Sequence, residues 1–232
     1  MTIKLIVALD FNNEVEAMRL VSQLDPAQCA LKVGSEMFTL LGTGFVKKLI
    51  TDRYKLFLDL KFHDIPNTVA RACKVAADLG VWMVNVHASG GLAMMRGARN
   101  AIDEYGQDRP LLIAVTVLTS MSSHQLPEIG VAASLPDQVE RLARLTHLAG
   151  LDGVVCSALE APIIKKTGGK NFLTVTPGIR LPGDAADDQS RIVTPKDAIM
   201  MGSDYLVVGR PVTKAHDPAA VVQTILASLE DE

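Results

Sequence analysis

Short apolar runs, rich in β-branched residues, recur along the chain and alternate with longer amphipathic stretches. Runs with so few polar positions are typical of parallel strands that are buried on both faces. We therefore expect eight strands, at residues 5–10, 30–34, 55–61, 82–88, 111–118, 152–157, 172–178 and 205–210. Apolar positions at helical spacing lie between them, for example at residues 15–24, 68–80, 92–106 and 137–150. The last three of these stretches end in glycine, which commonly stops a helix.

This regular alternation of strand and helix predicts an α/β fold. The chain has 232 residues, so eight strand–helix units would take about 29 residues each, close to the roughly 30 of a βαβ repeat. Eight such units can close into a (β/α)8 TIM barrel. An open doubly wound sheet would show the same alternation. Because no linker, charge block or low-complexity segment divides the sequence, we expect one barrel domain over residues 1–232.

Composition narrows the classes of partner. Hydrophobic residues make up 48% of the chain and charged residues 21%, an ordinary globular balance. The formal net charge of −3 gives no support for binding to nucleic acid or to an anionic membrane. Any affinity for an anion must therefore come from a local site. The N-terminal apolar run is too short for a signal sequence, and no stretch approaches the roughly 20 apolar residues of a membrane span.

The three cysteines, Cys29, Cys73 and Cys156, are far apart and odd in number. They show neither a disulfide framework nor the spacing of zinc ligands. Buried free thiols in a reducing compartment explain them best. We therefore expect a soluble cytoplasmic protein.

Polar residues stand at the carboxyl ends of most of the predicted strands. They are Asp10, Lys32, Asp59, Lys61, Asn85, His87, Thr116, Thr119 and Arg210. In barrels of this type, catalytic groups collect at the carboxyl ends of the strands. A single charge at such a position would be ordinary, but a set on successive strands is difficult to explain by stability alone. The pattern therefore predicts an active site at this end of the barrel.

Asp59 and Lys61 are two positions apart, so on a strand both side chains point to the same face. If that face is the barrel interior, the two charges cost several kcal/mol per ion in desolvation unless they pair well. An internal ion pair that only sets structural specificity would explain them equally well. Lys32 and Asp10 on neighbouring strands favour a functional cluster instead.

Asp64 precedes Ile65 and Pro66, a sequence that resembles the start of a helix. Aspartate is a common N-cap residue, and proline is common in the first helical turn. From the residues alone, we interpret Asp64 as the cap of the third helix.

Two loops have the composition of a phosphate site. One is Thr176-Pro-Gly-Ile-Arg180 after the seventh strand, and the other is Val208-Gly-Arg-Pro211 after the eighth. Barrels often bind phosphate at these two loops. Glycine lets backbone N–H groups approach the anion, and arginine offers a planar fork of donors. The long Gly/Pro/Asp-rich loop from Leu181 to Ser190 could be a plain flexible connection, but its place after the seventh strand is also that of a ligand-covering loop.

The motif DLKFHDIPNT at 59–68 has the D-x-K-x-x-D-I-P-x-T form of the orotidine 5′-phosphate decarboxylase family, which the chain resembles over nearly its whole length. Further matching segments follow in the family's order: ALD (8–10), LKVG (31–34), VNVHASGG (84–91), VTVLTSM (115–121), TPGIR (176–180) and VVGRP (207–211). Sugar-phosphate decarboxylases and synthases of the same barrel superfamily share D-x-K-x-x-D. Lys32 separates them, because those relatives look like magnesium enzymes with glutamate at that strand end.

The resemblance implies an enzyme that converts orotidine 5′-phosphate to UMP and CO2 without a metal or an organic cofactor. Lys61 would donate the proton to C6 of the pyrimidine. Asp59 would hold Lys61 and face the substrate carboxylate. Lys32 would pair with Asp59 and reach the ribose, and Asp10 would bind a ribose hydroxyl.

The resemblance also implies an obligate homodimer, in which Asp64 and Thr68 would reach into the active site of the other subunit. The loop over the base would contain Thr119 and Ser122. The phosphate would be surrounded by Arg180, Gln189, Gly209 and Arg210. The departing CO2 would enter an apolar pocket lined by Ile65, Leu118, Val155 and Pro177.

Three other functions stay open at this point. A metal-dependent sugar-phosphate decarboxylase or aldolase-type synthase would lose its activity with EDTA. A Schiff-base aldolase acting through Lys61 would be trapped by borohydride with a carbonyl substrate. A non-catalytic sensor of a phosphate ligand would bind tightly without turnover. The dense charge array argues against the sensor, because binding alone does not need a lysine and an aspartate forced together at a barrel mouth.

Overall fold

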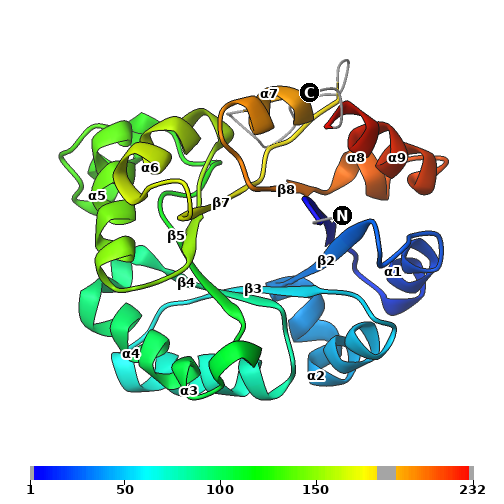
Figure 1. Cartoon of the computed structure of the whole chain (residues 1–232), viewed down its shortest axis with the longest axis horizontal. Coiled ribbons are helices and arrows are strands. Elements are labelled where there is room, and N and C mark those ends of the chain that lie inside the picture. The colour runs from blue at the N-terminus through cyan, green and yellow to red at the C-terminus, as the bar shows by residue number, and fades with distance from the viewer. Residues whose placement is uncertain (1–2, 182–191, 230–232) are drawn as a thin grey trace.

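The computed structural model describes residues 3–181 and 192–229. Within them, eight parallel strands pair in chain order and close into a barrel (Figure 1). The strands are β1 (Leu5–Leu9), β2 (Cys29–Gly34), β3 (Leu56–Phe62), β4 (Met83–His87), β5 (Leu111–Val115), β6 (Gly153–Val155), β7 (Leu173–Thr176) and β8 (Tyr205–Val208). Because β1 pairs with β8 as well as with β2, the sheet is closed. The predicted (β/α)8 barrel is confirmed, and the open doubly wound sheet is excluded.

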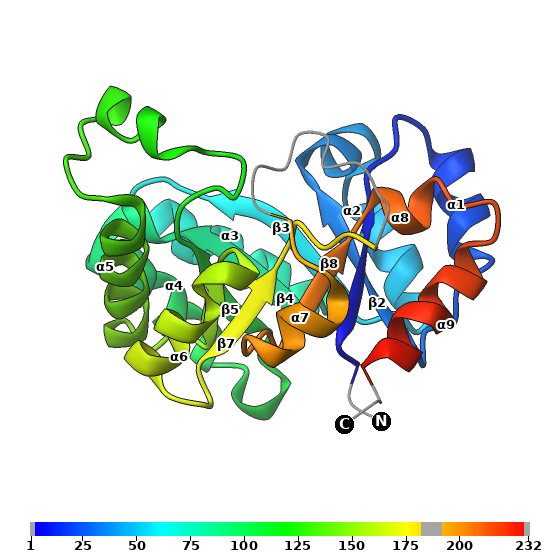
Figure 2. The ribbon, with the colours of Figure 1, turned by 90° about the horizontal axis from the view of Figure 1, so that it is seen from above.

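Helices follow the strands and surround the barrel (Figure 1). The α-helices are α1 (Glu14–Val21), α2 (Ser35–Thr51), α3 (Pro66–Asp78), α4 (Gly91–Asp103), α5 (Leu135–Leu148), α6 (Ala161–Gly168), α7 (Pro195–Met200), α8 (Arg210–Thr213) and α9 (Pro218–Ser228). Short 3-10 helices are η1 (Ala88–Gly90), η2 (Gly106–Asp108), η3 (Ser123–Gln125), η4 (Pro127–Ile129) and η5 (Ala158–Glu160). Figure 2 shows the segment between β5 and α5 extending away from the barrel.

Alternation along each strand divides the core into two layers. In β1, Leu5, Val7 and Leu9 belong to the large apolar layer between the strands and the helices. Ile6 and Ala8 belong to a smaller cluster inside the barrel. The other buried members of that inner cluster are Ala30, Phe57, Met83, Ile113, Val175 and Val207. Side chains therefore fill the barrel below its open end, as they do in barrels of this size.

Glycine ends two of the helices as predicted. Gly80 follows the C-cap of α3 with φ 81°, and Gly150 follows the C-cap of α5 with φ 77°. Both values lie in the left-handed region that glycine enters without steric cost. The stretch at 92–106 differs, because α4 ends at Asp103 and Gly106 begins the 3-10 helix η2.

The three cysteines are buried free thiols, which confirms that part of the prediction. Across the described residues, no helix combines the length and the apolar character that a bilayer crossing requires.

Candidate active site

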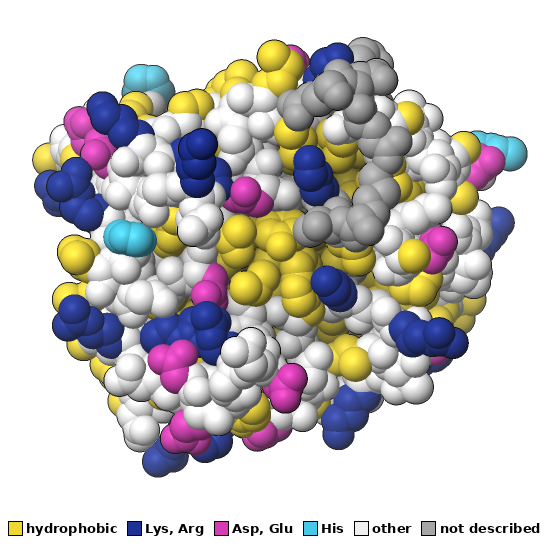
Figure 3. Space-filling view, in the orientation of Figure 1, with side chains coloured by type: hydrophobic (Ala, Val, Ile, Leu, Met, Phe, Trp, Pro, Cys, Tyr) yellow, Lys and Arg dark blue, Asp and Glu magenta, His cyan; other side chains and the backbone are white. Residues whose placement is uncertain are grey.

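A cavity of about 730 Å³ opens at the carboxyl ends of the strands. Figure 3 shows apolar side chains gathered at the centre of this face of the barrel, with basic and acidic side chains around them. The apolar part of the wall includes Ala8, Phe57, Val115, Leu118, Val155, Pro177 and Val207. The charged part includes Asp10, Lys32, Asp59, Lys61, Arg180 and Arg210. The site therefore combines an apolar floor with charged side chains from several strands and from the loops that follow them.

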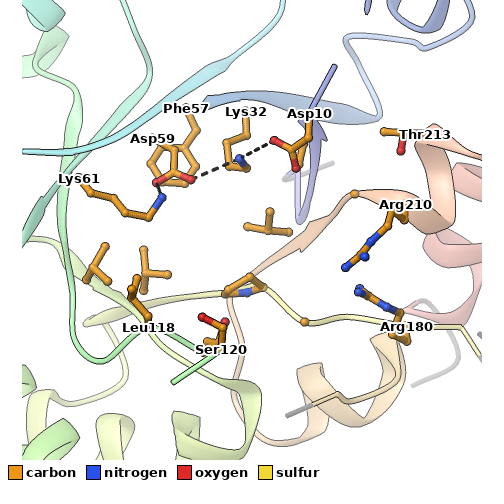
Figure 4. Close-up of a pocket in the computed structure, with 18 of the residues that line it drawn as sticks. Asp10, Lys32, Phe57, Asp59, Lys61, Leu118, Ser120, Arg180, Arg210 and Thr213 are labelled. Atoms are coloured by element: carbon orange, nitrogen blue, oxygen red, sulfur yellow. Dashed lines mark hydrogen bonds and ion pairs between the residues drawn. The ribbon is translucent and has the colours of Figure 1, made fainter. Parts of the chain in front are cut away.

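Four of these charged residues form one chain of ion pairs along one side of the cavity (Figure 4). Lys61 Nζ lies 2.8 Å from Oδ1 of Asp59. Lys32 Nζ lies 3.3 Å from Oδ2 of Asp59 and 3.4 Å from Oδ1 of Asp10. Asp59 and Lys32 are buried, whereas the side chain of Lys61 is 35% exposed and that of Asp10 is 63% exposed. Each carboxylate oxygen of Asp59 thus has its own ammonium partner.

The pairing keeps both buried members charged. Burial alone would lower the pKa of the Lys32 ammonium, but the carboxylates of Asp59 and Asp10 outweigh burial and hold that pKa above its usual value. Burial alone would raise the pKa of the Asp59 carboxyl, but Lys32, Lys61 and a hydrogen bond from Asn85 lower it. Asp59 is therefore an anion and Lys32 a cation at neutral pH.

The backbone between Asp59 and Lys61 differs from the regular strand that we expected. Lys61 has φ 51°, in the left-handed region that non-glycine residues seldom adopt. Leu58 pairs with Val84 and Phe62 pairs with Val86, so three residues of β3 stand opposite Asn85 alone. This irregularity is a bulge, a feature that re-aims side chains next to active sites. The contact between Asp59 and Lys61 therefore depends on a bulge as well as on spacing.

The two predicted phosphate loops lie at the far end of the same cavity. Figure 4 shows Arg180 and Arg210 side by side there, away from the row that contains Lys61. Arg180 is 7% exposed, and its Nη1 donates to the carbonyl of Ile179 at 2.9 Å. Gly209 also lines the cavity. It precedes α8 and lies beside β1, since a Cβ there would stand 3.8 Å from Cβ of Ala8 and 3.8 Å from Oδ2 of Asp10.

Thr119 lines the cavity, but its predicted companion Ser122 does not stand among the lining residues. Ser122 is instead the N-cap of η3, where its backbone N–H donates to Oε1 of Gln125 at 2.8 Å in a capping box. Gln189 lies outside the described residues.

Asp64, Ile65 and Thr68 do not line the cavity of their own chain. All three are exposed, and Ile65 is 66% exposed. The interpretation of Asp64 as the cap of α3 is wrong, because the N-cap position is Ile65. Oδ1 of Asp64 accepts from the adjacent Ile65 N–H at 2.6 Å, so its side chain is held beside the helix start without capping it. The predicted proline in the first turn is confirmed.

Several lining residues had no role in the sequence-based prediction. They are Phe11, Glu16, Phe57, Ser120, Thr213 and Lys214. Alternation along β3 could have indicated Phe57, which stands two positions before Asp59 on the inner face. Ser120 follows Thr119 directly. Glu16 and Lys214 are helix-side residues for which the sequence offered no signal.

The sequence marks Asn85 only as a polar residue near the end of the fourth strand. It is completely buried, and its side chain bonds to both sides of the bulge. Nδ2 donates to Oδ1 of Asp59 at 2.7 Å, and Oδ1 accepts from the backbone N–H of Lys61 at 2.8 Å. Asn85 therefore belongs to the framework of the charge array. Among the described residues, no group of three or more His, Cys, Asp and Glu side chains could hold a metal ion.

Comparison with known proteins identifies the family and the relatives that this chain resembles. Residues 3–225 match the Orotidine 5'-phosphate decarboxylase / HUMPS family. The chain is 61% identical over 229 residues to orotidine 5'-phosphate decarboxylase of Legionella pneumophila (strain Paris), covering 99% of this chain and 100% of that one. It is 59% identical over 226 residues to the protein of the same name from Actinobacillus succinogenes, covering 97% of each.

A solved structure of a protein with the same name has a similar fold. The crystal structure of orotidine 5'-phosphate decarboxylase from Lactobacillus acidophilus matches with a TM-score of 0.88 at 41% identity. That match covers 99% of this chain and 100% of the other. The fold, the charge array and the similarity over almost the full length agree, and the chain belongs to the Orotidine 5'-phosphate decarboxylase / HUMPS family.

Proposed function

We propose that this protein decarboxylates orotidine 5′-phosphate to UMP and CO2, a step of pyrimidine nucleotide biosynthesis, with residues 1–232 as one catalytic domain. The names of its relatives support this substrate. The observation that carries the proposal is the alternating array of Lys32, Asp59 and Lys61 against an apolar cavity floor. The three free buried thiols suit the reducing conditions of the cytoplasm, where we place the reaction.

The two ends of the cavity give the substrate its direction. Arg180 and Arg210, with Gly209, offer donors for the phosphate dianion. The pyrimidine would then extend toward Lys61. The ribose, between the phosphate and the pyrimidine, would lie beside Lys32 and Asp10 (Figure 4). Thr119, Ser122 and Gln189 are the residues that we assign to the loops around the base and the phosphate.

The chemical difficulty is the electron pair left at C6. When the bond between C6 and the carboxyl carbon breaks, the pair stays in an sp2 orbital that no neighbouring π system can accept. Enzymes that solve such problems lower the barrier by up to about 23 kcal/mol. The Lys61 ammonium, already held by Asp59, would stabilise the developing charge and then give its proton to C6. The products are UMP, CO2 and a neutral Lys61 amine, which solvent reprotonates.

Asp59 contributes through its fixed negative charge. Because its pKa is lowered, it stays ionised beside the substrate carboxylate. Like charges about 4 Å apart repel by about 4 kcal/mol at an effective dielectric near 20. Loss of CO2 removes this repulsion, so the interaction favours the transition state over the bound substrate. The neutral CO2 would leave past the apolar wall of Leu118, Val155 and Pro177.

We propose further that the protein acts as a homodimer with shared active sites. Asp64 and Thr68 are exposed and lie outside the cavity of their own chain, although they belong to the same motif as Lys61. A second copy placed against the β3–α3 connection would receive both side chains in its own cavity. The position of these two residues beside the site, rather than in it, supports a role across a subunit interface.

The reaction needs neither metal nor organic cofactor in this proposal, and a single assay tests that. Orotidine 5′-phosphate incubated with the protein and EDTA should lose the absorbance band of the orotate ring at the same rate as without EDTA. Persistence of the band in both samples would refute the proposed function. Activity that EDTA abolishes would favour a metal-dependent sugar-phosphate enzyme of the same barrel class.

A further inference from the structure

The proposed reaction needs the Lys61 ammonium to be held next to C6 of the substrate. Lys61, however, lies where the regular pairing between β3 and β4 is interrupted. Its φ of 51° is unfavourable for a residue with a side chain. Such a conformation costs about 1–3 kcal/mol and persists only when the surroundings enforce it. The ladder between β3 and β4 is interrupted from Leu58 to Phe62. Something other than strand pairing must therefore hold Lys61 in this conformation.

Asn85 occupies the gap in the ladder. It is the single residue of β4 between Val84 and Val86, which pair with Leu58 and Phe62 on either side of the interruption. Its amide oxygen accepts the Lys61 backbone N–H at 2.8 Å. That bond satisfies a backbone donor that the bulge removes from the sheet, and a buried donor left unpaired would cost about 1–3 kcal/mol.

The other half of the same amide holds the counter-ion. Asn85 Nδ2 donates at 2.7 Å to Oδ1 of Asp59, the oxygen that also contacts Lys61 Nζ at 2.8 Å. One side chain therefore fixes both the backbone of the lysine and the carboxylate that aims its ammonium. An amide is suited to this task, because it offers a donor and an acceptor together without adding charge.

We propose that Asn85 is a positioning residue, which sets the place of the Lys61 ammonium by bridging the Lys61 backbone and the Asp59 carboxylate. This inference rests on the proposed function for its catalytic consequence. Asn85 does not line the cavity, so it acts through Asp59 and Lys61 and not on the substrate. Since a misplacement of about 1 Å can lower a rate about 100-fold, the effect should appear in kcat.

Two substitutions of similar shape separate the two bonds. Asn85→Asp keeps an acceptor for the Lys61 N–H but replaces the donor to Asp59 with a carboxyl group. Asn85→Leu removes both. The charged groups of β3 that face this position are Asp59 and Lys61, and Lys32 lies beyond Asp59. His87 is two residues further along β4, and on β5 the paired residue is the apolar Ile113.

We expect kcat for orotidine 5′-phosphate to fall about 100-fold in both variants at pH 8, with KM changed less than about fivefold. In Asn85→Asp, kcat should recover as the pH is lowered, because the introduced carboxyl regains a proton that it can donate to Asp59. Asn85→Leu should show no such recovery. Thr146→Val in α5, which also loses a completely buried hydrogen-bonding side chain, should keep the wild-type kcat.

A kcat within about threefold of wild type in either variant would overturn the assignment, and so would a loss confined to KM. Hydrogen exchange of the Lys61 amide in the unmodified protein gives an independent test that needs no variant. Strong protection supports the bridge, and fast exchange contradicts it. If the unmodified protein releases no CO2 from orotidine 5′-phosphate, the proposed function fails, while amide protection still decides whether Asn85 holds Lys61.

Discussion

The Nζ atom of Lys61 lies 2.8 Å from Oδ1 of Asp59, and the backbone that joins the two residues leaves the regular strand conformation at Lys61. The carboxylate is buried, so it has little freedom to follow a moving partner. The ammonium is thus aimed before any substrate arrives. Charges that are already oriented need no reorganisation during the reaction, and this is where electrostatic catalysis gains most.

Removal of that ammonium should abolish most of the activity. We expect Lys61→Ala to lower kcat by at least about 10⁴-fold, because it removes both a charge at the reacting carbon and a proton donor. Steady-state decarboxylation of orotidine 5′-phosphate measures the effect. Lys55→Ala is the matched control, since Lys55 precedes the same strand and lies over the ring of Trp82. Equal losses in the two variants would indicate a general effect of lysine removal on the fold.

Neutralising Asp59 should weaken the fold in a pH-dependent way. Asp59→Asn leaves the buried Lys32 without its nearer partner, and breaking a buried pair in this manner costs about 3 kcal/mol. The folded-state pKa of Asp59 lies below its unfolded value. Its contribution to stability is therefore present above about pH 4, the unfolded pKa of aspartate, and is lost as the pH falls through the folded pKa.

Urea unfolding at pH 7 and at pH 3 measures this difference. The free energies of unfolding of wild type and Asp59→Asn should differ at pH 7 and converge in acid. Asp108→Asn, at an exposed carboxyl in η2, should show no comparable gap at either pH. A gap that widens in acid would mean that the Lys32–Asp59 pair does not have the charges described above.

The arginines at the far end of the cavity should affect turnover as well as binding. Binding energy gained at a phosphate distant from C6 can be used to order the charged array and the covering loops. We expect Arg210→Ala to lower kcat and to raise KM for orotidine 5′-phosphate. Its kcat/KM for orotidine, which lacks the phosphate, should stay near that of wild type. A change in KM alone would contradict the link between phosphate binding and turnover.

The barrel could be predicted from sequence because each unit repeats the same physical problem. A strand such as Leu5–Leu9 is apolar at every position, so it must be buried on both faces, which requires helices outside and packed side chains inside. Eight such strands close into a barrel when β1 pairs with β8. The apolar pattern of each strand predicts that the strand is buried. The closure of the barrel depends instead on pairing between β1 and β8, which are distant in sequence.

The site was harder to predict from sequence where one side chain alters the conformation of the backbone. The spacing of Asp59 and Lys61 brings them to one face. The bulge between them depends on Asn85, which is distant in sequence and has no role that the sequence alone indicates. Ser122 shows the opposite case, in which the signal is local and present in the sequence. Ser122 and Gln125 have the spacing of a capping box, which turns the chain into η3 soon after Thr119.

Asp64 gives the sharpest test of how the site is assembled, because its side chain contacts the start of α3 and not the cavity of its own chain. Homodimers of Lys61→Ala and of Asp64→Ala should each be nearly inactive if Asp64 serves the neighbouring site. In a mixed dimer, one cavity receives both defects and the other receives neither. Mixing the two inactive proteins should therefore restore up to one intact site in each heterodimer.

The measurement is decarboxylation after the two variants are mixed and allowed to exchange subunits. With random exchange, half of the dimers are mixed, so activity should rise to about one quarter of the wild-type value per subunit. Differently tagged chains report whether exchange has occurred. A mixture of Lys61→Ala with Asp59→Asn is the control, because each of these defects stays in the cavity of its own chain and no cavity regains a complete set. Exchange without recovery would place the function of Asp64 within its own subunit.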